Sequence, residues 1–175
     1  NAVSTGSMLN TIEYNEIYNV CTETQDCAAI YNGFGFTGRG NVIRYNYIHD
    51  IGQEDTHTHA IYLDSSYSGQ TIYGNIFENT GYTGVKAGTG RDNVISNNIF
   101  IDCGSHVMEY AAIEVGHWNR DMWLTGSSME DIVSQDFMGQ TIADVVKYDN
   151  EIWRKTFPEI YTTRFDFDPA VDSKD

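Results

Sequence analysis

Short hydrophobic phrases repeat along the first two thirds of the chain, at spacings far longer than a helical turn. The phrase Ile-x-x-Asn-x-[Ile/Phe] occurs four times, with its asparagines 31, 29 and 23 residues apart. Two residues after each copy stands a further Asn or Asp. The copies begin at Ile12, Ile43, Ile72 and Ile95, and the trailing residues are Asn19, Asp50, Asn79 and Asp102. A period of roughly 20–50 residues is typical of solenoids, in which each repeat forms one coil.

A second phrase alternates with the first. It starts with a small residue and a β-branched apolar residue and then alternates, which is the period-two pattern of a strand. Its copies begin at Ala29, Ala60, Gly84 and Ala112. The chain therefore holds two kinds of short strand in strict rotation, separated by turns rich in Gly and Asn.

Together these patterns predict an all-β fold, a right-handed parallel β-helix of about four coils. Equivalent strands stack about 4.8 Å apart, and parallel crossovers are normally right-handed. The expected inward apolar columns are Ile12, Ile43, Ile72 and Ile95 in one sheet and Ile30, Ile61, Val85 and Ile113 in another. The column Asn15, Asn46, Asn75 and Asn98 is expected to form an internal amide ladder. A leucine-rich horseshoe is disfavoured, because the repeat contains Ile, Asn and Tyr instead of Leu.

After the last repeat the pattern changes, so we expect coils over residues 1–117 and a cap with an acidic tail over residues 118–175. Apolar residues at mixed three- and four-residue spacing predict one or two short helices over residues 129–147. A further short helix is expected from Glu151 to Phe157, because Pro158 would end it.

Charge and composition narrow the range of partners. The chain has 25 Asp and Glu against 10 Lys and Arg, a formal charge of -15. Such a surface repels nucleic acid and anionic membranes, and it mildly disfavours a polyanionic substrate. The 12 tyrosines and 3 tryptophans supply flat amphipathic rings suited to sugars. A neutral polysaccharide or oligosaccharide is therefore the expected partner.

The cysteines and the first residue of the sequence give evidence on whether the protein is exported from the cell. Cys21 and Cys27 could close a small disulfide loop, while Cys103 has no neighbour in sequence. Two nearby cysteines favour export only weakly. The sequence opens with Asn1 rather than Met, which suggests that a leader or a longer N-terminal portion was removed. No stretch of about 18 apolar residues is present.

Several stretches resemble the right-handed parallel β-helix repeat proteins, a group related to pectate-lyase-like and glycosidase β-helices. The stretches are Asn41-Val42-Ile43-Arg44-Tyr45-Asn46, His59-Ala60-Ile61-Tyr62-Leu63-Asp64, Gly90-Arg91-Asp92-Asn93, residues 21–31 and Glu151-Ile152-Trp153-Arg154-Lys155. The resemblance implies a secreted, extracellular protein that acts on polysaccharides. It does not fix the chemistry, since the group includes hydrolases, lyases, epimerases and non-catalytic adhesins. Its members are usually longer, so we expect further coils N-terminal to this chain or a second chain there.

Strand alternation predicts which side chains face outward. If the second apolar column points inward, its successors Tyr31, Tyr62, Lys86 and Glu114 form an outward column. A second outward column holds Gly33, Asp64, Gly88 and Gly116. Rings, charges and a bare glycine floor on an exposed sheet would make a groove for a glycan.

Paired carboxylates make glycoside hydrolysis the leading interpretation. Asp64 and Glu114 lie two coils apart, which corresponds to about 10 Å between their backbones along the axis. Side-chain reach could bring them to the roughly 6.5–9.5 Å that suits an inverting hydrolase. Asp26 is a third catalytic candidate. The alternative is that these acids merely solubilise an acidic protein.

A polysaccharide lyase is the second interpretation. Lyases need a base for the proton beside a uronate carboxylate, and a cation or calcium to neutralise that carboxylate. Lys86, Arg91 and Tyr62 could serve, with Asp64 or Asp26 holding calcium; otherwise no cofactor is expected. Lys86 could instead form an ordinary surface salt bridge, which contributes little. A non-catalytic glycan-binding or structural module is the third interpretation.

The histidines are assigned to the edges of the groove. His57 and His59 stand at alternate positions, but further ligands at metal-site spacing are missing, so we predict no metal site. His57 or His59 is expected at the rim as a hydrogen-bonding, substrate-contacting group. His117 could form the far wall, with Trp118 plugging the core.

Overall fold

The structure is a computed structural model with two compact units, Asn1–Trp118 and Asn119–Asp175. The residues it describes are 1–4, 7–33, 38–53, 56–64, 67–88, 90, 92–104, 112–115, 136–137, 140–141 and 151–158.

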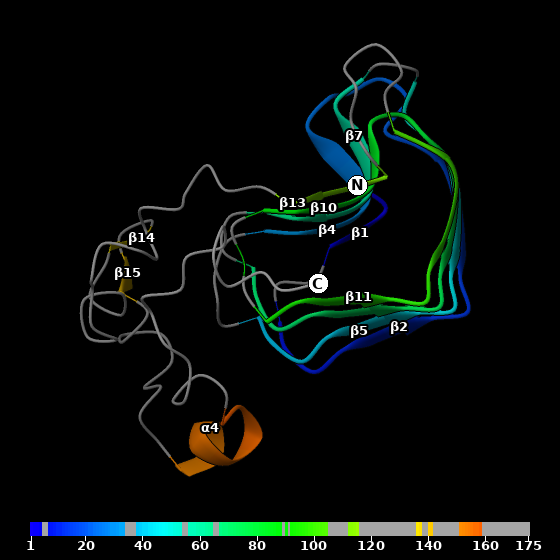
Figure 1. The fold of residues 1–175 in the computed structure, drawn as a ribbon. Coiled ribbons are helices and arrows are strands. Elements are labelled where there is room, and N and C mark those ends of the chain that lie inside the picture. Colours follow the sequence, from blue (N-terminus) through cyan, green and yellow to red (C-terminus); the bar gives the residue numbers. More distant parts are fainter. Residues whose placement is uncertain are drawn as a thin grey trace. The chain divides into compact units, whose positions relative to one another are not determined.

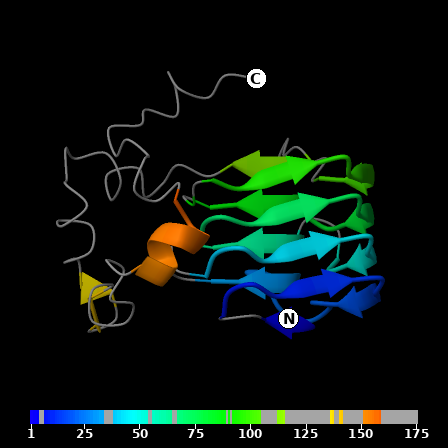
Figure 2. The same cartoon turned by 90° about the horizontal axis from the view of Figure 1, so that it is seen from below.

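The first unit consists of three parallel sheets, named A, B and C. Sheet A contains β1 (Val3–Ser4), β4 (Cys27–Asn32), β7 (Thr58–Leu63), β10 (Thr83–Ala87) and β13 (Ile113–Val115). Sheet B contains β2 (Thr11–Glu13), β5 (Val42–Arg44), β8 (Thr71–Tyr73) and β11 (Val94–Ser96). Sheet C contains β3 (Glu16–Val20), β6 (Tyr47–Ile51), β9 (Ile76–Thr80) and β12 (Ile99–Cys103). Each coil supplies one strand to sheets B, C and A in turn, which confirms a parallel β-helix of four coils (Figures 1 and 2).

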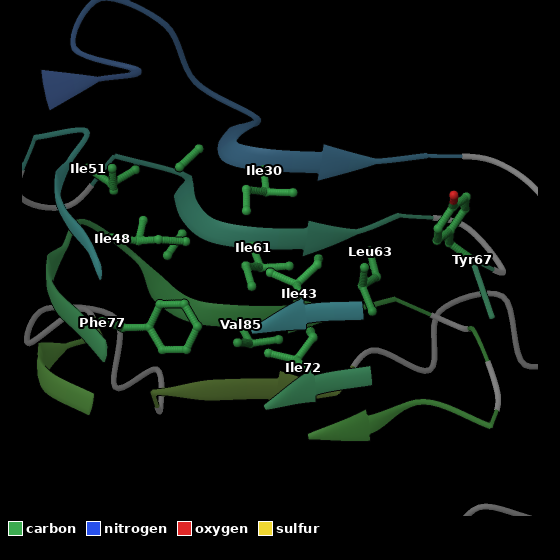
Figure 3. Close-up of a cluster of buried hydrophobic side chains, with 12 residues drawn as sticks. Ile30, Ile43, Ile48, Ile51, Ile61, Leu63, Tyr67, Ile72, Phe77 and Val85 are labelled. Atoms are coloured by element: carbon green, nitrogen blue, oxygen red, sulfur yellow. The ribbon is translucent and has the colours of Figure 1, made fainter. Parts of the chain in front are cut away.

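Both predicted apolar columns are present and in register. Ile12 pairs with Ile43, Ile43 with Ile72 and Ile72 with Ile95 in sheet B. In sheet A, Ile30 pairs with Ile61, Ile61 with Val85 and Val85 with Ile113. The central members of the two columns are completely buried and face one another between the sheets (Figure 3). Each buried side chain of this size contributes roughly 1.5–3 kcal/mol, so the interior of the coils is the main source of stability.

The predicted asparagine ladder runs along the corner between sheets B and C. Each Asn Nδ2 donates to the Oδ1 of the next asparagine, over 3.0 Å at every step from Asn15 to Asn98. The backbone N–H groups of the first three asparagines donate to the same acceptors. Asn75 also donates to the Ile43 carbonyl oxygen, 2.9 Å away. The ladder thus satisfies buried polar groups at a bend, where strand pairing alone leaves them unpaired.

The residues that trail each repeat have a conformational role. Asn19, Asp50, Asn79 and Asp102 all adopt left-handed backbone conformations, with φ of 53°, 51°, 49° and 47°. Asn and Asp tolerate this region better than other non-glycine residues. Asn or Asp therefore recurs at this position because the backbone of every coil takes a left-handed conformation there, in sheet C.

The two cysteines close in sequence do not form a disulfide in this structure: Cys21, Cys27 and Cys103 are free thiols. Cys27 is buried, and its Sγ atom lies 3.3 Å from Thr24 Oγ1. The disulfide that could have closed this five-residue loop is absent, and Cys27 contacts Thr24 instead.

In the second unit, the expected helix near the end is present as α4 (Glu151–Thr156). The helices predicted over residues 129–147 are wrong at the positions that the structure describes, because β14 (Asp136–Phe137) and β15 (Gln140–Thr141) pair antiparallel there. The stretch for which helices were predicted contains Gly139, and glycine is a poor residue for a helix interior. Among the described residues, no helix has the length and apolar character needed to cross a membrane.

The ladder predicts a graded loss of stability. Asn75→Ala removes a buried amide and leaves the Asn46 N–H and the Ile43 carbonyl without their partner, so we expect the free energy of unfolding to fall by about 3 kcal/mol. Asn15→Ala removes the exposed end of the same ladder and should cost about 1 kcal/mol or less. Urea unfolding of both variants measures the difference, and equal losses would contradict the proposed role of the ladder.

Candidate active site

The predicted outward column lies side by side across four strands of sheet A. Tyr31 pairs with Tyr62, Tyr62 with Lys86 and Lys86 with Glu114. The residues that precede the first three of these belong to the buried core. Alternation therefore directs the column to the outer face of the sheet.

The expectation that this column lies open to solvent is wrong for its centre. Tyr62 is 4% exposed and Lys86 is 6% exposed. The cause is a cluster of rings beside them: the centroid of His57 lies 4.7 Å from that of Tyr82, and the centroid of His59 lies 4.8 Å from that of Tyr62. The centre of the column is therefore covered by side chains and is not a flat exposed sheet.

An irregularity in sheet A produces this ring cluster. Ala60 and Ile61 are consecutive in sequence, yet both belong to the core, as do Ala29 and Ile30 in the preceding coil. In the next coil, the N–H groups of residues 84 and 85 donate to a single carbonyl, that of Ala112. The register keeps the same number of residues in each strand, so no residue is inserted, and the two consecutive inward side chains themselves interrupt the alternation. His59 therefore meets the outward ring of Tyr62, although strict alternation would send it inward.

Lys86 is the central charge of the site. Its Nζ atom lies 3.1 Å from His57 Nε2 and 3.5 Å from Glu114 Oε1. The ammonium group also lies 5.3 Å from the centroid of the Tyr62 ring, within range of a cation–π contact. The surface salt bridge suggested by the sequence is instead a buried contact with a carboxylate, an imidazole and a ring.

His57 contacts both Lys86 and Asp26, a residue of the first coil. Its Nδ1 atom lies 3.4 Å from Asp26 Oδ1. Burial lowers the pKa of His57 below its ordinary value, and the Lys86 charge lowers it further, while Asp26 and Glu114 oppose the change. The imidazole is therefore neutral at neutral pH. Asp26, expected to act near Asp64, contacts His57.

A second contact positions Asp64. The Tyr31 hydroxyl donates to Asp64 Oδ2 over 2.8 Å. Burial raises the pKa of Tyr31, and the hydrogen bond to Asp64 raises it further, so the phenol keeps its proton. A Cβ atom at Gly33 would lie only 2.4 Å from the Tyr31 hydroxyl oxygen. The glycine floor is thus not bare at Gly33, because the Tyr31 ring lies over it.

Tyr62 and His59 form the inner wall of the site. Burial raises the pKa of Tyr62, and the negative charges of Asp64 and Asp26 raise it further. His59 is 0% exposed, and its Nδ1 atom lies 2.8 Å from Thr83 Oγ1. Its buried Nε2 atom has no hydrogen-bond partner among the described residues. His59 supports the ring cluster rather than presenting an open face to a ligand.

Some predicted site residues lie outside the described residues: Arg91, Gly116, His117 and Trp118. Within the described part of the chain, no group of three or more His, Cys, Asp or Glu side chains could hold a metal ion. Sequence reasoning gave His57 only a place at the rim and did not use Tyr82. The sequence feature that pointed to His57 was its position two residues before His59.

His59 predicts a specific acid sensitivity. Burial, together with the charges of Lys86 and His57, lowers the pKa of His59 to about 2 in the folded protein. In the unfolded chain the same imidazole gains its proton near pH 6.5. The unfolded state therefore binds the extra proton first, and stability falls as pH decreases below about 6.5. His59 should contribute up to about 1.4 kcal/mol of loss per pH unit over this range. Urea unfolding at several pH values should show a weaker dependence in His59→Gln, and identical slopes for both proteins would refute the assignment.

Comparison with known proteins agrees with this architecture. Residues 2–134 match the family described as a right handed beta helix region. No curated protein and no solved structure matches the chain. The matched segment covers most of the chain and includes all three parallel sheets, and the family is compatible with pectin-lyase-like folds. The fold is a right-handed parallel β-helix, and the chain belongs to the right-handed β-helix family.

Proposed function

We propose that this protein is a carbohydrate-active enzyme that hydrolyses glycosidic bonds of a polysaccharide on the outer face of sheet A. One observation carries the proposal: two sets of ionisable groups from successive coils converge there. Tyr31 contacts Asp64, and Asp26, His57, Lys86 and Glu114 form a continuous chain of contacts. Clustered ionisable groups are typical of catalytic sites, and two members of this cluster, His57 and Tyr31, have shifted pKa values.

The two carboxyl groups have surroundings suited to different tasks. Asp64 is oriented by a hydrogen bond from a phenol, which suits the base that activates a water molecule. Glu114 contacts Lys86 through Oε1, while its buried Oε2 atom has no hydrogen-bond partner among the described residues. An oxygen without a hydrogen-bond partner suits the carboxyl group that delivers a proton to the leaving group. The residues lie two coils apart, which is compatible with an inverting mechanism.

The surroundings of the site favour a neutral glycan. The chain carries a formal charge of -15, and the site itself holds three carboxyl groups against one ammonium group among its described members. Such a field repels a polyanion, whereas the tyrosine rings offer apolar contact to a sugar. Because polysaccharides of this kind lie outside cells, we also propose that the protein is secreted.

The test is product analysis on a panel of plant, algal and microbial glycans. On the glycan that is cleaved, Asp64→Asn should lower turnover by about 10²–10⁴-fold, because the water-activating base is lost. Asp102→Asn makes the same change at an exposed position of sheet C, where Asn tolerates the left-handed backbone, and should leave turnover unchanged. Binding without turnover on every glycan, or full activity of folded Asp64→Asn, would remove this proposal.

The buried Lys86 favours a second candidate, elimination on a uronate polysaccharide. Its ammonium group could neutralise the uronate carboxylate, with the neutral His57 beside it as a base. The two reactions give different products from the same digest: hydrolysis adds water, whereas elimination leaves an unsaturated sugar that absorbs ultraviolet light. We expect hydrolysis products only. An ultraviolet-absorbing product that is lost in Lys86→Met would select the lyase.

A further inference from the structure

We infer that His57 and Asp26 are positioning residues that hold the Lys86 ammonium group in place, with Asp26 acting through the imidazole. This inference rests on the proposed function, because Lys86 contacts Glu114, one of the two carboxyl groups to which hydrolysis is assigned. It also changes the role of Asp26, which the sequence suggested as a catalytic carboxylate. Two contacts support the inference: Asp26 with His57, and His57 with Lys86.

The hydrogen-bonding capacity of the neighbours fixes the tautomer of His57. A lysine ammonium group can only donate, so Nε2, which lies 3.1 Å from Lys86 Nζ, must be the unprotonated nitrogen. An ionised carboxylate can only accept, so Nδ1, which lies 3.4 Å from Asp26 Oδ1, must carry the proton. Both contacts agree on one neutral tautomer, in which the imidazole accepts from Lys86 and donates to Asp26.

The position of each partner is fixed independently of these contacts. The Asp26 N–H donates to the His57 carbonyl oxygen over 2.7 Å, which holds the loop before β4 against the residue before β7. The His57 ring meets Tyr82 and His59 nearly edge-on, at interplanar angles of 81° and 83°. The imidazole plane is therefore held by rings on its own coil and on the next one. A ring held in this way can position a flexible lysine side chain.

Acidification would reverse this arrangement. The groups that face His57 are Asp26 before β4, His59 on β7, Tyr82 before β10, Lys86 on β10 and Glu114 on β13. When His57 gains a proton, Nε2 becomes a donor and repels the ammonium group. Lys86 then keeps only Glu114 as a hydrogen-bonding partner among these groups. Turnover should therefore fall with pH through the lowered pKa of His57, on the acid side of about 6.5.

The first experiment needs no substrate. Nitrogen NMR of the intact protein should show His57 with its proton on Nδ1. In Asp26→Asn, the carboxamide can donate to the ring, so the Nε2-protonated tautomer should become populated and the pKa of His57 should fall further. In Lys86→Met, that pKa should rise. Asp50→Asn changes a second His–Asp contact, Asp50 with His49 over 2.8 Å on sheet C, and should leave His57 unchanged.

The second experiment uses the glycan found by the panel. His57→Phe offers Lys86 no acceptor and should lower turnover by about 10²-fold, the effect of misplacing a group by about 1 Å. His57→Gln offers a carbonyl oxygen that does not titrate, so it should retain more activity and lose the acid limb of the pH profile. A proton on Nε2 in the wild-type protein, or an acid limb that persists in His57→Gln, would overturn the inference. If no glycan is cleaved while NMR finds the stated tautomer, the proposed function fails and the geometry of Asp26 and His57 stands.

Discussion

The in-register stacking of parallel strands is the constraint on which both faces of this protein depend. Side chains alternate between the faces of a strand, so a slip of one residue between coils would move the buried isoleucines outward and the ionisable groups inward. The asparagine ladder prevents such a slip, because each amide bonds its counterpart in the next coil at the same bend. A contact at the corner between sheets B and C thus fixes the register that brings Tyr62 beside Lys86 in sheet A.

Stacking also explains how distant residues assemble one site. Asp26, His57 and Lys86 belong to three successive coils and meet because neighbouring strands lie only about 4.8 Å apart. Burial of Lys86 has a cost, since an ammonium group loses hydration when it is covered. Contacts with a carboxylate, an imidazole and a ring offset that loss at Lys86. The same covering keeps His57 neutral and Tyr31 protonated, which separates the groups that hold protons from those that accept them.

The sequence predicts what repeats and fails where the repeat is broken. The isoleucine columns, the ladder and the order of Tyr31, Tyr62, Lys86 and Glu114 follow from spacing alone, and the structure has them in that order. Alternation could not foresee that the consecutive residues Ala60 and Ile61 both point inward, and therefore could not bring His59 to Tyr62. It also treated Gly33 as open floor, because only coordinates show that the Tyr31 ring lies over it. The contact of Asp26 with His57 arises between two turns, for which strand periodicity gives no rule.

The composition of the columns separates structural from chemical positions. A column that stabilises the stack benefits from the same residue in every coil, because each member satisfies or packs against the next; the ladder is therefore all Asn. The outward column of sheet A instead changes from Tyr to Lys to Glu, so a buried ammonium group lies between a ring and a carboxylate. Such a pair is seldom more stable than apolar residues of similar volume. Stability alone does not account for that choice, whereas the function proposed for this face of the sheet does.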